Sequence, residues 1–181
     1  WTVRGVFDHV AGIEAVMTGW LPDDNQTLPP FDKAAQFVKD PAPYLGKMKS
    51  VFDLRRRDLA ALAAEDLDRP SWMPVGPGTY GRFLAIRVFD IWVHERDITT
   101  PLGRTTDDTG IAAELALAQV ESSIGFIVGK KVGLPDGKSI TFDLTGPIQR
   151  QLHVRVDGRA AKVDHLDNPD VTVTTDSTTF I

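Results

Sequence analysis

The chain has 181 residues, of which 42% are hydrophobic and 25% charged, a balance typical of one globular domain of ordinary size or two small ones. Its net charge of −5 excludes the basic surface that nucleic-acid-binding proteins need. No apolar run reaches the roughly 18 residues of a membrane span and no leader peptide is visible, so we expect a cytoplasmic protein without a membrane partner.

The absence of cysteine limits the chemistry available to the chain. It excludes disulfides, a cysteine nucleophile and a thiolate metal site. Any thiol chemistry therefore needs a thiol from outside the protein.

Apolar residues at helical spacing predict an antiparallel helical bundle in the first 130 residues. The expected helices span 3–20, 32–39, 44–65, 80–99 and 108–128, with Thr2 and Thr79 as N-caps and a loop at 74–78. The residues expected on the inner face of the third helix are Leu45, Met48, Phe52, Leu59 and Leu62. The cluster Arg55–Arg57 lies beside acidic residues, which favours a solvated helix face.

The pattern changes after Lys131, and alternating residues predict strands at 140–144, 152–156 and 171–175. A turn is expected at Asp157-Gly158, and Asp176 or Ser177 can cap a further helix. The expected fold class is therefore α plus α+β, with a helical bundle over 1–130 and a small α+β domain over 134–181. The chain starts at Trp1 and stops as an element begins, so we expect one helix before it and more of the α+β domain after it.

One face of the expected helix 80–99 carries a polar stripe on an otherwise apolar surface. Arg87, Asp90, His94 and Asp97 follow at three- and four-residue steps, so they share one face. The i, i+4 pair Asp90 and His94 has the spacing with which two residues of a helix bind one metal ion. His9, at the edge of the first helix's apolar stripe, is the candidate third ligand. With three protein ligands, a zinc site keeps one position open for water or substrate.

Spacing alone leaves other interpretations open, and a solvent-exposed polar face is the more common one. Arg87 either holds a carboxylate of a substrate or thiol, or is a structural charge, in a salt bridge to Asp90 or on the surface. Asp97 either orients a metal ligand or is a surface charge at the helix end. His153 and Arg155 share one face of their strand, which is either substrate-facing or plain solvent surface.

Several separated motifs give the chain a family resemblance. They are Trp1-Thr2-Val3-Arg4 leading to His9, the segment FDIWVHERDI at 89–98 followed by Pro101-Leu102-Gly103, and the tail segments 144–147, 153–158 and 169–176. In this order they resemble the mycothiol-dependent maleylpyruvate isomerase family. The resemblance implies a DinB-like four-helix bundle, whose first helix is missing here, and a truncated sterol-carrier-protein-like α+β domain.

The resemblance also implies a zinc site, or another divalent metal, on His9, Asp90 and His94. The acidic ligand is often Glu in this family, so Asp90 is one methylene shorter. Arg155 is the best match to the family's substrate-binding arginine. The implied cofactors are zinc and mycothiol, and the implied partners are a low-molecular-weight thiol and a small electrophile.

The implied mechanism is attack of a metal-bound thiolate on that electrophile, which is maleylpyruvate in the isomerase and another molecule in a transferase. Two alternatives remain open. One is a metal-dependent hydrolase that uses zinc-bound water, and the other is a non-catalytic protein that binds a metal and a small ligand. The sequence gives no indication of the oligomeric state.

Overall fold

The computed structural model describes residues 1–23, 29–35, 43–73 and 75–181. By its internal contacts the chain divides into two compact units. The first unit contains residues 1–87 and 94–105, and the second contains 88–93 and 106–181. Helix α4 (Tyr80–Thr99) contributes one stretch of residues to each unit. The mixed helix-and-sheet class confirms the expected α plus β composition.

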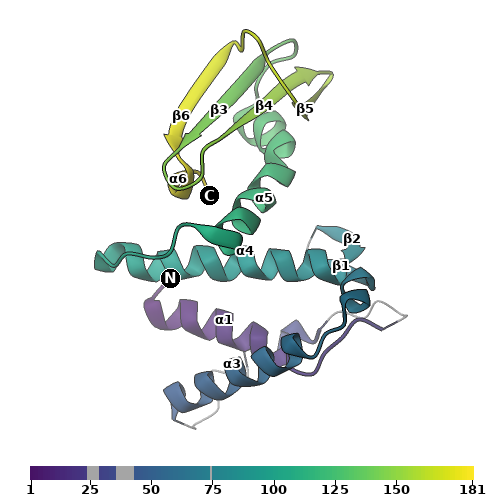
Figure 1. Ribbon diagram of the computed structural model, residues 1–181, viewed down its shortest axis with the longest axis vertical. Helices are drawn as coiled ribbons and strands as arrows, with labels where there is room; N and C mark the ends of the chain where they lie inside the picture. Colours follow the sequence, from purple (N-terminus) through teal and green to yellow (C-terminus); the bar gives the residue numbers. More distant parts are fainter. Residues whose placement is uncertain (24–28, 36–42, 74) are drawn as a thin grey trace. The chain divides into compact units, whose positions relative to one another are not determined.

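The long helices of the first unit are α1 (Val3–Met17), α3 (Tyr44–Ala60) and α4 (Figure 1). The predicted N-caps are confirmed, because the side chains of Thr2 and Thr79 accept hydrogen bonds from the backbone N–H groups of Gly5 and Arg82. Short 3₁₀ turns, η1 (Phe31–Lys33), η2 (Ala64–Asp68) and η3 (Thr100–Leu102), join these elements. The second half of the helix expected at 32–39 lies outside the described residues, and the described part contains the η1 turn.

The core of the first unit forms where α1 meets α3 and the start of α4. Its buried residues are Ala11, Met17, Met48, Met73, Tyr80 and Phe83. The expected inner face of α3 is wrong at two positions, since Leu45 is 80% exposed and Leu59 is 41% exposed. The solvated basic face is also wrong at Arg55, which is 3% exposed. A buried carboxylate on α1 accounts for this, as described below.

A β-hairpin precedes α4 where the sequence predicted a loop. Its strands β1 (Pro70–Met73) and β2 (Gly76–Thr79) pair antiparallel, with Ser71 opposite Gly78. The segment Gly76-Pro77-Gly78 has low strand propensity, so its pairing depends on the neighbouring strand. The side chain of Met73 lies in the core, which fixes the hairpin on the unit.

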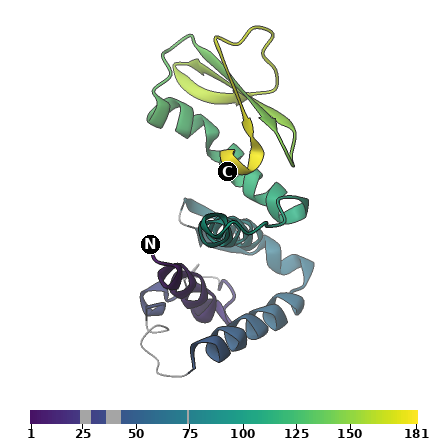
Figure 2. The ribbon, with the colours of Figure 1, turned by 90° about the vertical axis from the view of Figure 1, so that its left-hand side faces the viewer.

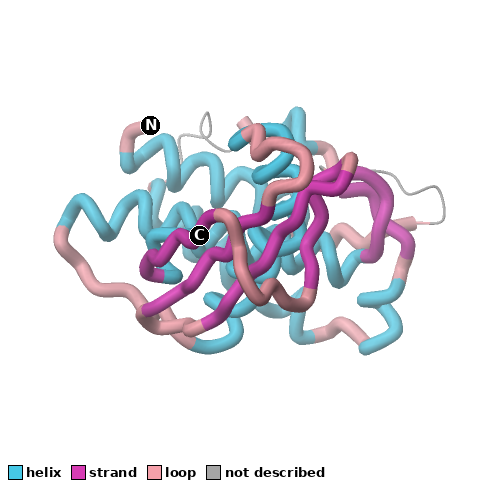
Figure 3. Tube along the Cα trace, turned by 90° about the horizontal axis from the view of Figure 1, so that it is seen from above, coloured by secondary structure: helices cyan, strands magenta, loops and turns pink. Residues whose placement is uncertain are grey.

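The second unit is built on a four-stranded sheet of order β5-β4-β3-β6 (labelled in Figure 1), whose strands are among the magenta tubes of Figure 3. Its strands are β3 (Ser139–Thr145), β4 (Arg150–Asp157), β5 (Arg159–Val163) and β6 (Val171–Asp176). Neighbouring strands pair antiparallel except β3 and β6, which are parallel. The three predicted strands are confirmed, and β5 is an additional one. Gly158, at φ +63°, makes the predicted tight turn between β4 and β5.

Helix α5 (Gly110–Phe126) packs against β4 and β5 and continues into a π-helical turn, η4 (Ile127–Val132) (Figure 2). The core of this unit lies between α5 and the sheet, and Leu117, Leu152 and Val154 are its centre. Asp176 caps the short helix α6 (Ser177–Phe180), as predicted. Because α5 packs on the sheet, a four-helix bundle is not confirmed among the described residues, and the boundary at 130/134 stays a prediction.

Residues Gly110–Val132 form a helix long and apolar enough to cross a membrane by length and composition, which corrects the expectation that no segment reaches that length. One such helix is weak evidence for a span. In this chain one face of it, including Ala113 and Leu117, is buried in the core of the second unit. On the same side of the helix, Glu121 forms ion pairs with Arg150 and Lys162 of the sheet.

Candidate metal centre

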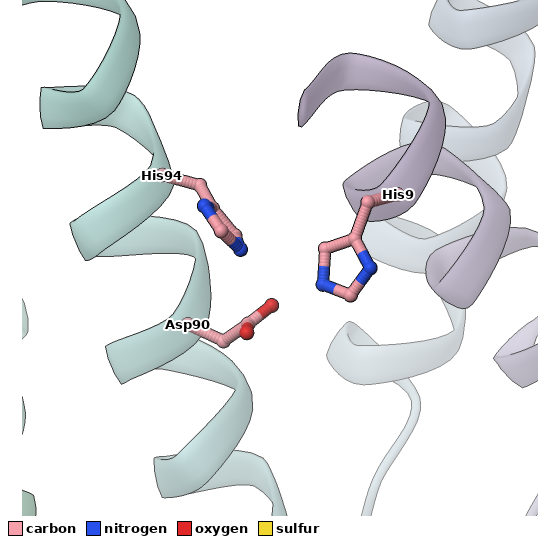
Figure 4. A group of neighbouring side chains, drawn as sticks. All are labelled: His9, Asp90 and His94. Atoms are coloured by element: carbon pink, nitrogen blue, oxygen red, sulfur yellow. The ribbon is translucent and has the colours of Figure 1, made fainter. Parts of the chain in front are cut away.

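The three predicted metal ligands lie together between α1 and α4. One ligand atom from each of His9, Asp90 and His94 lies within 4.8 Å of the others, and all three residues are half-buried. Figure 4 shows His9 reaching from α1 toward the Asp90 and His94 side chains, which point from successive turns of α4. The polar stripe of α4 therefore faces α1 here, although a solvent-exposed face was the more common interpretation of its spacing.

The donor set fits a first-row divalent cation. Two imidazoles and one carboxylate are typical ligands of catalytic zinc sites and of two-histidine, one-carboxylate iron sites. Ligand atoms about 2.0–2.2 Å from a tetrahedral ion lie roughly 3.5 Å apart, so small side-chain rotations bring these atoms into range. Three protein ligands leave a position for an exchangeable group.

Asp97 orients the His94 ring. Nδ1 of His94 lies 2.7 Å from Oδ2 of Asp97. An ionised carboxylate can only accept a hydrogen bond, so Nδ1 carries the proton and donates it, and Nε2 keeps its lone pair for a metal ion. Such carboxylate–histidine pairs fix the tautomer and orientation of metal-binding histidines. This geometry supports the orienting role that the sequence left open for Asp97.

Trp1 packs against both histidines. Its ring stacks on His94 at 5.6 Å between centroids and 17° between planes, and it meets His9 edge-on at 5.2 Å. The histidine rings lie edge-to-face, 5.0 Å apart. The indole therefore covers one face of the His94 ring.

Arg87 takes part in a buried ion-pair network that the sequence analysis missed. Nε and Nη2 of Arg87 donate to Oε1 of Glu14 over 3.1 and 2.9 Å. Nε of Arg55 donates to Oε2 of the same carboxylate over 2.9 Å. Glu14, Arg55 and Arg87 are all buried. The signal that could have shown this is a single Glu inside the apolar stripe of α1, a position that needs a cationic partner.

Arg155 and His153 lie in the second unit on one face of β4, as predicted, but with different exposure. Arg155 is exposed, whereas His153 is buried and its Nδ1 lies 2.8 Å from the hydroxyl of Thr141. The ring of His165, to which we assigned no role, packs edge-on against His153. The role of Arg155 in substrate binding stays a prediction.

Fold and site together define a class of protein in which helices α1 and α4 carry a two-histidine, one-carboxylate cluster and the chain continues into an α+β segment. A family model described as the mycothiol maleylpyruvate isomerase N-terminal domain matches residues 1–99. The chain belongs to this family, as its motifs indicated.

Comparison with solved structures gives a match to a crystal structure of a histidine-to-alanine mutant of the mycothiol-dependent maleylpyruvate isomerase. The match has a TM-score of 0.57 and 14% identity, and covers 98% of this chain and 70% of the other. At this identity the likeness shows the fold alone. No curated protein sequence matches the chain.

Proposed function

We propose that this protein is a zinc-dependent, cytoplasmic enzyme that uses mycothiol as its thiol and acts on a small electrophile such as maleylpyruvate, as an isomerase or an S-transferase. The observation that carries the proposal is the His9, Asp90 and His94 cluster, with ligand atoms within 4.8 Å on two facing helices. Family membership supports the thiol, because the family is named for mycothiol. The absence of cysteine agrees with a nucleophile that comes from outside the chain.

In this proposal His9, Asp90 and His94 hold the metal ion, which when bound lowers the pKa of a thiol at the open position. Asp97 keeps the proton on Nδ1 of His94 and so keeps Nε2 directed toward the ion. The ring of Trp1 packs on one face of the His94 ring and so helps to hold its orientation.

We further propose that Arg155 holds a carboxylate of the electrophile, in keeping with its predicted role. Arg87 was predicted for the same task. Its guanidinium already binds the carboxylate of Glu14, and we assign it the positioning of α4 against α1. In this role Arg87 affects the metal ligands by holding the two helices in place, and it makes no contact with the substrate.

Metal analysis of the purified full chain tests the proposal first. We expect one zinc per chain in the wild type and loss of stoichiometric zinc in His94→Ala. His165→Ala is the matched control, because this exposed histidine lies outside the cluster and its loss should leave the zinc content unchanged. Wild-type protein with no bound metal, or His94→Ala with undiminished zinc, would refute the metal centre.

Thiol-dependent turnover then separates the enzyme from its alternatives. The proposed enzyme converts maleylpyruvate, or alkylates the thiol with another electrophile, only when zinc and a low-molecular-weight thiol are both present. Ester or amide hydrolysis without thiol would instead identify the hydrolase that uses zinc-bound water. A protein that unfolds on zinc removal and binds no thiol would be the non-catalytic binding protein, and iron in place of zinc would change the metal assignment.

A further inference from the structure

A pocket of about 550 Å³ opens in the first unit directly beside the cluster. It is formed by the start of α1 and by the end of α4 with the η3 turn. Its apolar lining consists of Trp1, Val3, Val6, Ile98, Pro101 and Leu102. This volume lies within the range of small-molecule sites, and its apolar lining is typical of them.

The pocket is continuous with the candidate metal centre through one side chain. His94 lines the pocket and is also one of the three clustered ligands. The Trp1 ring that stacks on His94 forms part of the same lining. A molecule whose reacting atom lies at the cluster can therefore extend a substituent into this pocket without leaving the site.

The charges around the pocket argue against an anionic substituent. Among the described residues that line it there is no lysine or arginine, and Asp97 is the one carboxylate. Two arginines that adjoin lining residues in sequence are engaged elsewhere, since Arg4 donates to Asp8 and Arg96 donates to Glu95. Asp90 and Asp97 balance the charge of a divalent ion at the cluster, so a carboxylate in the pocket would meet no unpaired positive charge among the lining side chains.

The apolar side chains of the pocket are poorly covered by the chain itself. Leu102, which lines the pocket, is 60% exposed. Contiguous exposed apolar surface beside polar groups is typical of a ligand site. An uncharged hydrocarbon group placed there removes this surface from water and gains affinity at about fourfold per buried methylene.

We propose that this pocket binds an uncharged, apolar substituent of the small molecule that reacts at the cluster, and that it selects against a carboxylate in that position. The inference rests on the proposed function, because it takes the cluster as the reacting centre. Within the proposed function it favours a thiol or an electrophile that carries a hydrocarbon arm, on the side of the reacting atom that faces Leu102 and Trp1, over the dicarboxylate maleylpyruvate.

A series of simple thiols tests the proposal with zinc-loaded full-length protein. The probes are ethanethiol, 1-propanethiol, 1-butanethiol and 3-mercaptopropionate, and the readout is Kd from calorimetric titration, with thermal shift as a second measurement. We expect Kd to fall about threefold to fourfold with each added methylene. We expect 1-butanethiol to bind at least tenfold more tightly than 3-mercaptopropionate, which replaces the apolar end with a carboxylate.

Leu102→Lys should reverse this preference, because it removes apolar surface and adds a cation at the pocket. We expect the affinity ratio of 1-butanethiol to 3-mercaptopropionate to fall at least tenfold. Leu45→Lys is the matched control, since Leu45 is an exposed leucine of the same unit that does not line the pocket, and its ratio should equal that of wild type.

The outcomes separate this inference from the proposed function. Equal affinity for all four thiols overturns the inferred apolar preference of the pocket. So does a 1-butanethiol to 3-mercaptopropionate affinity ratio that Leu102→Lys leaves unchanged. Neither result contradicts the proposed thiol-using enzyme. Zinc-loaded protein that binds none of the thiols overturns both. Chain-length dependence that Leu102→Lys abolishes and Leu45→Lys preserves supports the proposal.

Discussion

The buried carboxylate of Glu14 offers the sharpest test of what holds the first unit together. Glu14→Gln keeps the size and shape of the side chain but removes its charge. In the wild type one carboxylate receives three hydrogen bonds of 2.9–3.1 Å from Arg55 and Arg87. The substitution leaves two buried guanidinium groups and replaces one accepting oxygen with an amide group that cannot accept.

The expected cost follows from burial. The side chains of Glu14, Arg55 and Arg87 are 6%, 4% and 10% exposed, so water cannot replace the lost charge. Removing one partner of such a buried pair typically costs about 3–5 kcal/mol. Asp58, whose Oδ2 lies 3.8 Å from Nη1 of Arg55, compensates one cation in part. We therefore expect a loss of about 3–4 kcal/mol, and roughly 10 °C in Tm for a chain of this size.

Thermal and urea unfolding followed by circular dichroism measure the effect. Asp53→Asn is the control, because Asp53 pairs with Lys49 and Arg56 on the exposed side of α3, where water screens the charges, and little change is expected. A Glu14→Gln protein no less stable than this control would refute the reasoning. Joint replacement of Glu14, Arg55 and Arg87 by methionine should recover most of the loss, because no charge then remains buried.

Two further predictions concern single carboxylates. Asp97→Asn should weaken zinc binding about 10- to 100-fold without unfolding the protein, because it removes the acceptor that fixes the His94 ring, and unchanged affinity in a competition titration would exclude that role. Hydrogen bonds from Lys138 and Ser139 lower the pKa of Asp170 to about 2, so the stability that it contributes is present above pH 4 and is lost as the pH falls from about 4 to 2. A carboxyl NMR titration should show this midpoint, and Asp170→Asn should remove this part of the acid dependence.

The features of the fold that were predictable are those encoded over a few residues. Periodicity and capping side chains gave the whole of α4 and both N-caps, since these depend on neighbours three or four positions away. Alternation gave β3, β4 and β6 in the same way. The β1–β2 hairpin was missed because its second strand has no intrinsic strand preference and forms only against its partner.

The candidate site was predictable to the extent that it is local. Asp90 and His94 are recognisable because their spacing on one helix is fixed by helix geometry, and His9 required the family resemblance as well. The partners of Arg87 and Arg55 were not recognisable, because Glu14 lies 73 and 41 residues away in sequence. Such a pairing depends on tertiary packing, which the sequence of one helix does not contain.

The non-local ion pair and the local metal motif depend on each other. Helices α1 and α4 run in opposite directions (Figure 1), and they are joined at two levels, Glu14 with Arg87 and His9 with Asp90 and His94. Glu14 lies about 7.5 Å along α1 from His9, and Arg87 lies about 4.5 Å and 10.5 Å along α4 from Asp90 and His94.

The distance along α1 from Glu14 to His9 is midway between the distances along α4 from Arg87 to Asp90 and from Arg87 to His94. The ion pair therefore sets the axial position at which the imidazole of His9 arrives between the two ligands of α4. Because a metal site tolerates errors of only a few tenths of an ångström, a helix shift after loss of the Glu14 charge separates the ligand atoms. Zinc affinity and unfolding stability should fall together in Glu14→Gln, whereas Asp97→Asn should lower the affinity alone.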